Sequence, residues 1–414
     1  MMLNPKRTIA ELLELKALTD NGLGAQRVAF SPGWQKARKW FLNKVQQFPF
    51  TTEMDAAGNL WVKIQGQRPE ELWIGGHLDS VPSGGWLDGV FDLLAGLEVL
   101  RTYTSVKPPV TLCLVDWADE EGSRFGRSLF GSSAVSGSLK KEELFSLKDA
   151  SGLSLAEVLE AYGLSANKVG EAAKLKNKAV AYLEVHIEQG PILEKLSVPL
   201  GAVLGTAGVE RHRLVFRGQT NHSGATPMRL RKDAFVGAAR LVTFLRSVAN
   251  RYQGVATAGC CELEPGIPTA IPGVCRLTIE ERNLDKTNLE KMWEETVKEA
   301  QKIANEENLK LEAEPLLRIE PVRFHPQLVE LCKESIREVC SKVHLLGSGP
   351  LHDASEIAKA GIPTAMMFVQ SKEGISHSPK EDSAIEHLEM AVVAFEKWVK
   401  KTIHWLLQKL PEKA

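Results

Sequence analysis

Four apolar runs in the sequence each end in side chains that are common metal ligands. These are ELWIGGHLD with His77 and Asp79, TLCLVDWADEEG with Glu120 and Glu121, AYLEVHIEQG with His186, and TAMMFVQSKEGISHSP with His377. Such runs, followed by Gly, Ser or Pro, are typical of buried strands that leave a sheet. In open α/β sheets, ligands bind outside the carboxyl ends of the strands. We therefore expect one polar pocket at a sheet edge, most simply a metal site.

The composition is that of an ordinary folded enzyme. The 51 basic and 52 acidic residues give a net charge of -1, which predicts no surface for nucleic acid or membranes, so a small-molecule partner is expected. The N-terminal residues lack the apolar core of a signal peptide, and no run reaches the roughly 18 apolar residues of a transmembrane helix. The six cysteines form no CxxC pair. These features predict a cytoplasmic protein with structural cysteines.

The order of strand and helix patterns predicts a fold interrupted by an insertion. Residues 1–208 and 321–414 alternate between apolar strands and amphipathic helices, which predicts an α/β domain with a mostly parallel sheet covered by helices. Residues 209–320 hold two alternating strand patterns, at 211–218 and 274–282, and two amphipathic helices. We expect a smaller α+β domain inserted into a discontinuous catalytic domain.

The ligand-type residues suggest different roles. We expect the side chains of His77 and Asp79 to diverge, with His77 as a ligand and Asp79 as the partner that fixes its tautomer. Asp88, beyond the glycine-rich turn SGGWLDG, can fold back beside His77 and bridge two cations. Glu120 and Glu121 are adjacent, so one is expected to bind metal and the other to act as general acid or base.

Each of these residues also has a plainer explanation when it is taken alone. A histidine at a strand end is commonly a hydrogen-bonded structural residue, DEEG is commonly a solvated turn, and Asp88 can be a helix N-cap. The coincidence of several such residues favours a site. Five of the ten histidines lie in Gly-, Ser- or Asp-rich loops beside apolar runs: His77, His186, His222, His352 and His377.

Longer segments of the sequence resemble a known family. GGHLDSVPSGGWLDG, DEEGSRFGRSLFGS, EVHIEQGP, GQTNHSGATPM, IPG followed by EER, LHDAS and GISHSPKED occur in the order found in the M20-type metallo-amidases of the carbamoylase branch. That branch contains N-carbamoyl-L-amino-acid hydrolases, β-ureidopropionases and allantoate amidohydrolases. The resemblance covers nearly the whole chain. The short gap between His77 and Asp88, and the presence of His186, favour this branch over the exopeptidases of the superfamily.

The resemblance implies a two-metal centre in a di-metal exopeptidase-like catalytic domain. One ion would be bound by His77, Asp88 and His186. The other would be bound by Asp88, Glu121 and His377, with Asp88 bridging the two. Zn, Mn, Co and Ni all suit such nitrogen and oxygen ligands.

The resemblance also implies roles for residues around the metals. Glu120 matches the general base, and His222 matches a residue that reaches across a dimer to stabilise the oxyanion. Arg282 matches the clamp on the substrate carboxylate, and Gln189 and His352 match further substrate contacts. A turn histidine and a surface arginine are the plainer alternatives for His222 and Arg282. The inserted domain would be a lid and dimerisation domain that closes over the metals.

The chain departs from the family pattern at Thr269. The family commonly has Asn in the segment Asn-x-Ile-Pro, where this chain has Thr269 before Ala270, Ile271 and Pro272. An Asn amide both donates and accepts, whereas Thr offers one shorter hydroxyl. A contact to the substrate carboxylate or ureido group is therefore expected to be altered, which leaves the substrate open.

The leading hypothesis is a dimeric, metal-dependent hydrolase that acts on N-carbamoyl-L-amino acids and releases amino acid, ammonia and carbon dioxide. Allantoate amidohydrolase and β-ureidopropionase share every motif quoted above and remain alternatives. An aminoacylase or dipeptidase is a third, which would release no ammonia. A non-catalytic binding protein on the same fold is disfavoured by the pair Glu120 and Glu121, since binding alone needs no base beside a metal.

Overall fold

Two units make up the chain in the computed structural model, which describes residues 1–410. Unit 1 comprises Met1–Gly205 and Phe324–Ala414, and unit 2 comprises Thr206–Arg323. The domain boundaries expected from the sequence, 208/209 and 320/321, lie close to these ends. Residues 411–414 of the expected catalytic domain lie outside the described residues. The roles of unit 2 as a lid and in dimerisation stay predictions.

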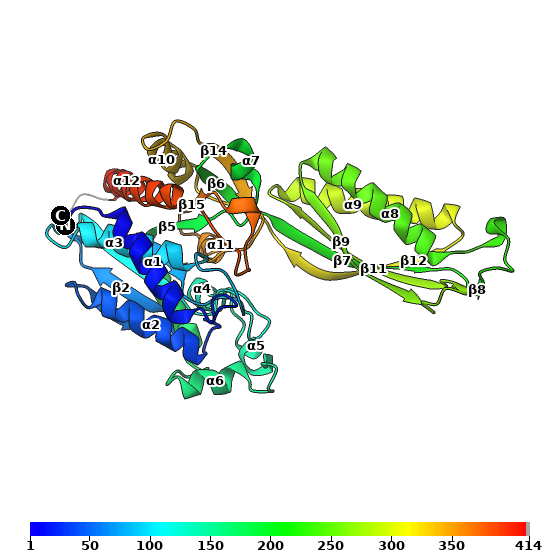
Figure 1. Cartoon of the computed structure of the whole chain (residues 1–414), viewed down its shortest axis with the longest axis horizontal. Helices are drawn as coiled ribbons and strands as arrows, with labels where there is room; N and C mark the ends of the chain where they lie inside the picture. The colour runs from blue at the N-terminus through cyan, green and yellow to red at the C-terminus, as the bar shows by residue number, and fades with distance from the viewer. Residues whose placement is uncertain (411–414) are drawn as a thin grey trace. The chain divides into compact units, whose positions relative to one another are not determined.

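The sheet of unit 1 brings the four apolar runs together. Its strands are β1 Thr51–Met54, β2 Leu60–Ile64, β3 Arg68–His77, β4 Val110–Trp117, β5 Ala179–Ile187, β6 Leu200–Thr206, β14 His344–Ser348 and β15 Thr364–Val369. The strand order is β1-β2-β4-β3-β5-β15-β6, with β14 beside β6. Figure 1 labels β2, β5, β6, β14 and β15 of this sheet. Strands β4, β3, β5 and β15 pair in parallel, while β2 and β6 join this group in antiparallel pairing. The carboxyl ends of the four parallel strands therefore meet at one edge.

Helices flank this sheet in two groups. They are α1 Pro5–Thr19, α2 Pro32–Val45, α3 Val90–Thr102, α4 Phe130–Ser136, α5 Lys141–Ser146, α6 Leu155–Ala161, η1 Val169–Lys178, α7 Ile192–Leu196, α10 Pro326–Arg337, α11 Asp353–Lys359, η3 Lys372–Gly374 and α12 Ile385–Lys409. Helices α1, α3, α10 and α12 pack in one group, and α4, α11 and η1 pack in another. This arrangement confirms the predicted fold class. Among the described residues, none of the helices has both the length and the apolar character that crossing a membrane requires.

Local sequence explains where α1 and α2 begin and why β4 is buried in the middle of the sheet. The Asn4 side chain accepts the backbone N–H of Arg7 ahead of α1, and Ser31 caps α2 in the same way. In both helices a proline occupies the first turn, where its missing N–H has no consequence. Strand β4 is buried along its whole length, and Trp73 and Trp117 are fully buried. Such continuous burial is typical of parallel strands covered on both faces.

Unit 2 is an antiparallel sheet covered by two long helices. Its elements are β7 Gly208–Arg217, β8 Asn221–His222, η2 Met228–Leu230, α8 Ala234–Tyr252, β9 Val255–Glu264, β10 Ala270–Ile271, β11 Val274–Asn283, α9 Lys286–Glu306, β12 Lys310–Ile319 and β13 Val322–Arg323. The main sheet has the order β12-β7-β11-β9, and β8 pairs with β10. Figure 1 labels the four strands of the main sheet and the helices α8 and α9. Along β11, buried and half-exposed residues alternate: Leu277 and Ile279 pack in the core with the helices, and Arg282 lies on the other face.

The sequence predicts β7, β11 and both helices but gives no indication of β9 and β12. Both are edge strands of the main sheet, and their side chains are mostly exposed. Strand β12 contains Pro315 at a register shift, a residue that only an edge or a bulge tolerates well. A strand that buries few side chains has no alternating apolar pattern in its sequence, so β9 and β12 cannot be predicted from the sequence.

We predict that Gly131→Ala destabilises unit 1, although alanine favours helices. Gly131 in α4 donates its N–H to Ala118 O at 2.8 Å, which holds the segment after β4. A Cβ on Gly131 would lie 1.9 Å from Asn59 Oδ1 and 2.7 Å from Ala118 N. We expect urea denaturation to show a loss of about 3 kcal/mol in the free energy of unfolding. Gly170→Ala in η1 is the control, because no atom lies within 4 Å of its Cβ position. Equal effects of the two substitutions would contradict this account.

Candidate metal centre

The carboxyl ends of the parallel strands carry the side chains expected to bind metal. His77 is the last residue of β3, and His186 lies one residue before the end of β5. Glu120 and Glu121 follow β4, and His377 lies in the loop between η3 and α12. The strand order places β4, β3, β5 and β15 side by side, so these distant segments of the chain meet at one edge.

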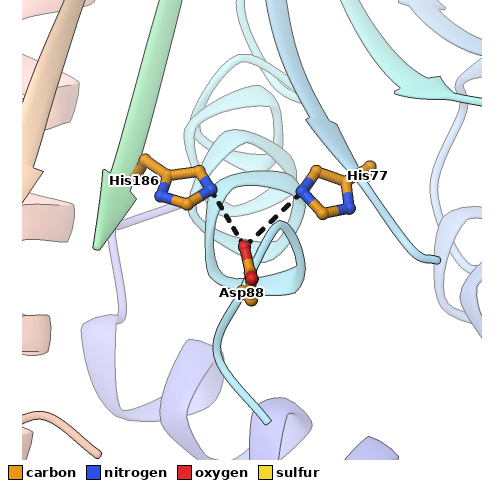
Figure 2. A group of neighbouring side chains, drawn as sticks. All are labelled: His77, Asp88 and His186. Carbon is orange, nitrogen blue, oxygen red and sulfur yellow. Dashed lines mark ion pairs between the residues drawn. The ribbon is translucent and has the colours of Figure 1, made fainter. Parts of the chain in front are cut away.

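Two histidines face one oxygen of Asp88 (Figure 2). His186 Nε2 lies 3.1 Å from Asp88 Oδ1, and His77 Nε2 lies 3.6 Å from the same atom. The potential ligand atoms of the three residues all lie within 4.8 Å of one another, and all three residues are buried. We call this group the first triad. Two imidazole nitrogens and a carboxylate at this spacing suit a divalent transition metal.

The hydrogen bond at Nδ1 of each ring determines whether Nε2 carries a hydrogen or a lone pair. His186 Nδ1 lies 2.8 Å from Ile187 O, and His77 Nδ1 lies 3.1 Å from Asp79 O. A carbonyl oxygen only accepts hydrogen bonds, so each Nδ1 carries a hydrogen, and a neutral ring turns the lone pair of Nε2 toward Asp88. A lone pair and a carboxylate oxygen repel each other unless a proton or a metal ion lies between them. The donor set of the first triad therefore fits a metal ion.

The second oxygen of Asp88 faces another possible ligand group. Asp88 Oδ2 lies 3.2 Å from His377 Nε2, which lies 3.4 Å from Glu121 Oε2. The potential ligand atoms of these three residues, the second triad, also lie within 4.8 Å of one another. Asp88 is common to both triads and turns a different oxygen to each. A carboxylate in this position can bridge two cations.

Asp79 ties the end of β3 to the segment after β4. Its carboxylate accepts the backbone N–H groups of Glu120 and Glu121 at 3.3 and 3.1 Å. Asp79 Oδ1 also lies 3.6 Å from His77 Nδ1. The expected divergence of His77 and Asp79 is wrong, because side chains two residues apart on an extended segment share a face. The Glu120 carboxylate approaches His77 Nε2 to 3.9 Å and belongs to neither triad.

Burial of the acidic groups raises their affinity for protons. Burial raises the pKa of Glu120 well above its ordinary value, opposed by His77 and reinforced by Asp353. Burial and the nearby charge of Asp88 raise the pKa of Glu121 to about 7. Carboxylates crowded in a water-poor place favour any cation that neutralises them, whether a proton or a metal ion.

In Asp88 and His377, interactions with neighbouring groups outweigh the effect of burial on the pKa. Burial acts to raise the pKa of Asp88, but hydrogen bonds with His186 and His377 and the charge of His77 hold it well below its ordinary value. The bond to Asp88 raises the pKa of His377 to about 8, against the effect of burial. At neutral pH the metal-free cluster therefore holds protons on nitrogen and oxygen atoms that a metal ion would have to displace.

Gln189 and His352 adjoin the first triad. Gln189 Nε2 donates to Asp88 Oδ2 and to Ser376 Oγ, both at 3.0 Å. His352 is buried, and its ring centroid lies 4.5 Å from that of His186. Both side chains contact residues of the triads, and their binding of substrate stays a prediction.

The remaining predicted residues belong to unit 2. His222 pairs with Ala270 in the β8–β10 ladder, directly beside Thr269. Arg282 lies near the far end of β11 and forms an ion pair with Glu280 at 2.7 Å. Within the unit, therefore, His222 and Thr269 are neighbours and Arg282 is remote from both.

Sequence reasoning misses several acidic residues around the triads. Asp92 is buried, lies 3.9 Å from His186 Nε2, and neither of its carboxylate oxygens has a hydrogen-bond partner among the described residues. Its place one helical turn after Asp88 is a spacing that points to the same site. Asp353 and Glu381 are also buried, and both lie inside the quoted motifs LHDAS and GISHSPKED.

The structure thus places a candidate two-metal centre at the edge of an α/β sheet. Residues 73–401 match the model of peptidase family M20/M25/M40, and the chain belongs to this family. It is similar to N-carbamoyl-L-amino acid amidohydrolase from Geobacillus stearothermophilus, with 33% identity over 368 residues, or 88% of this chain and 90% of that one. Allantoate amidohydrolase from Bacillus subtilis is 31% identical over 377 residues, covering 90% of this chain and 91% of that one.

A solved structure shows the same fold. The crystal structure of an amidase of the hydantoinase/carbamoylase family from Burkholderia multivorans matches with a TM-score of 0.88 and 29% identity, covering 96% of this chain and 97% of that one. Together with the family match, these relatives identify the chain as a hydrolase of carbon–nitrogen bonds outside peptides.

We predict that affinity for a divalent ion falls as the pH is lowered from about 8 to about 6. The ion binds deprotonated ligands, so it must displace protons from Glu121, with a pKa of about 7, and His377, with a pKa of about 8. Each displaced proton should change the affinity by about tenfold per pH unit. Calorimetric titration of metal-depleted protein with Mn²⁺, in buffers of different ionisation enthalpy, measures the affinity and the protons released. Affinity that is independent of pH, without proton release, would contradict this prediction.

Proposed function

We propose that the protein is an N-carbamoyl-L-amino-acid amidohydrolase that uses two divalent metal ions. The observation that carries the proposal is the sharing of the Asp88 carboxylate between two triads, each with the donor set of a metal site. Two ions held by these residues would polarise the scissile carbonyl and would make water easier to deprotonate. The ligand atoms suit Zn, Mn, Co and Ni alike. Relatives named N-carbamoyl-L-amino-acid amidohydrolase at about 30% identity support the carbamoyl group as the reacting part.

Glu120 is the general base in this proposal. Its carboxylate lies beside the first triad without belonging to it, 3.9 Å from His77 Nε2. The hydrogen bond from the Glu120 backbone to Asp79 fixes the segment that carries it. Glu120 would take the proton of the attacking water and return it to the leaving nitrogen.

Unit 2 supplies the groups that recognise the substrate. His222 Nδ1 accepts the backbone N–H groups of Gly224 and Ala225 at 3.0 and 3.2 Å, so the neutral ring carries its hydrogen on Nε2. That N–H is a preset donor for an oxyanion. The planar guanidinium of Arg282 suits a two-pronged contact with the substrate carboxylate. Thr269, beside His222, would offer the substrate a single hydroxyl.

The positions of His222 and Arg282 support a homodimer. From Val274 to Arg282, β11 spans about 27 Å at 3.4 Å per residue. His222 lies beyond Val274, beside Ala270. A ureido-carboxylate substrate is much shorter than this span, so one copy of unit 2 cannot place both residues on it. We therefore assign the His222 that acts on a given substrate to the second copy of the chain.

Allantoate amidohydrolase is the second candidate function. Relatives with this name are 30–31% identical to the chain, almost the same as the carbamoyl-amino-acid enzymes. Allantoate also combines a ureido group with a carboxylate, so the same two-metal chemistry and the same arginine clamp serve it. The two functions differ only in what surrounds the reacting group.

Product analysis tests the proposed function. Metal-depleted protein, with and without added Mn²⁺, Co²⁺ or Zn²⁺, is given N-carbamoyl-L-methionine, N-carbamoyl-β-alanine, allantoate or an N-acetyl amino acid. We expect metal-dependent release of ammonia and amino acid in equal amounts from the carbamoyl-L-amino acid. Ammonia from allantoate alone would establish the second candidate, and no turnover of any compound would contradict both.

We predict that Glu120→Gln abolishes most turnover and leaves metal binding intact. The amide keeps the shape of the side chain but cannot take a proton, so kcat should fall by about 10²–10⁴-fold. Metal content and calorimetric affinity should match the wild type, since Glu120 belongs to neither triad. Glu160→Gln on the exposed face of α6 is the control and should retain kcat. Wild-type turnover in Glu120→Gln would rule out the general base.

Mixed dimers test whether His222 acts in trans. His222→Ala and Glu120→Gln subunits should each be inactive alone, because each lacks one group that every site needs. After exchange of subunits, a mixed dimer regains one complete site, so about a quarter of wild-type activity should return. Each variant carried through the same exchange alone is the control. Confirmed exchange without recovery would show that the site is built within one chain.

A further inference from the structure

One buried carboxylate contacts two of the three segments that carry the second triad, the loop of Asp88 and the loop of His377. Glu381 is 2% exposed. Its Oε1 accepts the backbone N–H groups of Leu87 and Asp88 at 3.0 and 3.1 Å. Its Oε2 accepts the hydroxyl of Ser376 at 2.7 Å, one residue before His377. A single side chain thus joins the loop before α3 to the loop before α12.

The hydrogen bonds of Glu381 continue into a closed ring. Ser376 Oγ accepts from Gln189 Nε2 at 3.0 Å, and the same amide group donates to Asp88 Oδ2 at 3.0 Å. The backbone N–H of Asp88 returns to Glu381. The ring therefore connects segments that follow three different strands, and a shift of any one of them disturbs the Asp88 carboxylate.

The buried Arg27 also holds the loop before α3. A Cβ on Gly85 would lie 1.9 Å from Glu381 Oε1, so only glycine leaves room for the carboxylate. The fully buried Arg27 donates to Leu78 O at 2.8 Å and to Gly85 O at 3.5 Å. Arg27 and Glu381 together leave this loop little freedom to move.

The backbone of two members of this region needs such support. His377 has a φ of 53° and Gln189 a φ of 56°, in the left-handed region that non-glycine residues rarely adopt. Such conformations persist only where the surroundings impose them. The Ser376 hydroxyl bound to Glu381 lies directly before His377 and fixes the start of its turn.

We propose that Glu381 is a positioning residue of the metal centre that sets the distance between Asp88 and His377. The inference rests on the proposed two-metal function. Glu381 acts through the loops and not on a metal ion, because its oxygens are occupied by two N–H groups and a hydroxyl. The second triad depends on both loops, whereas the first depends on one. Loss of Glu381 should therefore weaken the second ion more than the first.

Metal titration of substitutions at Glu381 tests this role without any substrate. Metal-depleted wild type, Glu381→Ala and Glu381→Gln are titrated with Zn²⁺ by calorimetry, and bound metal is counted by mass spectrometry after gel filtration. We expect Glu381→Ala to bind the second ion about 10–100-fold more weakly. Glu381→Gln should lose less, because its amide oxygen can still accept the N–H groups of Leu87 and Asp88.

Glu98→Gln separates positioning from general stability. Glu98 in α3 is also a fully buried glutamate, and it accepts the backbone N–H of Asn4 and the side chain of Arg7, neither of which belongs to a triad. We expect Glu98→Gln to lower the unfolding midpoint of the metal-free protein and to retain both metal affinities. A purely structural role would give Glu381→Ala the same behaviour.

Two intact metal affinities in Glu381→Ala would overturn the proposal. If that substitution prevents folding, Ser376→Ala removes the link to Oε2 of Glu381 together with the bond that Ser376 accepts from Gln189, and it should weaken the second ion by a smaller factor. An unchanged second ion in Ser376→Ala would then overturn it equally. Wild-type protein that binds a single ion would overturn the two-metal function and the role of Glu381 together, a result distinct from two ions in every variant.

Discussion

The carboxylate of Asp88 is the group on which the site depends. His186 and His77 face one of its oxygens, and His377 faces the other, at 3.1–3.6 Å. His77 and His186 lie at the ends of β3 and β5, and His377 lies in the loop between η3 and α12. The strand order of the sheet brings these distant segments to one carboxylate. Burial then makes the arrangement unfavourable without a cation, because water cannot reach the crowded charges to stabilise them. The fold therefore both brings the ligand groups together and creates the need for a cation between them.

Much of this arrangement can be predicted from the sequence, because parallel strands end at the same edge and His77, His186 and His377 each follow an apolar run. The pattern of residues does not show which oxygen of Asp88 faces which ring, since that depends on the turn through Gly89, where a Cβ would lie 2.4 Å from the His77 ring. Nor does it show the role of Glu381, whose partners are backbone N–H groups almost three hundred positions away. The edge strands β9 and β12 escape for a related reason: their register is set by pairing with β11 and β7, and their own side chains bury too little to leave a pattern.

In the proposed function, unit 1 supplies the metal ligands and the general base, and unit 2 supplies the groups that bind the substrate. Unit 1 holds the triads and Glu120, and in the proposal unit 2 holds the donor His222, the neighbouring Thr269 and the clamp Arg282. Because β11 keeps Arg282 far from His222, a small substrate would, in this proposal, take the two groups from different copies, and activity would then require a dimer. Carbamoyl amino acids and allantoate present the same carboxylate and ureido groups to such a site. The choice between them then falls to the side chains around those groups, with the single hydroxyl of Thr269 among them.

The central claim, that Asp88 bridges two metal ions, is tested most directly by anomalous X-ray scattering from crystals of the wild-type protein loaded with Zn²⁺. The account predicts two anomalous peaks about 3.5–4 Å apart, one on each side of the Asp88 carboxylate, with one ion bound to His77 and His186 and the other to Glu121 and His377. A single peak, or two peaks that share no ligand at Asp88, would contradict it.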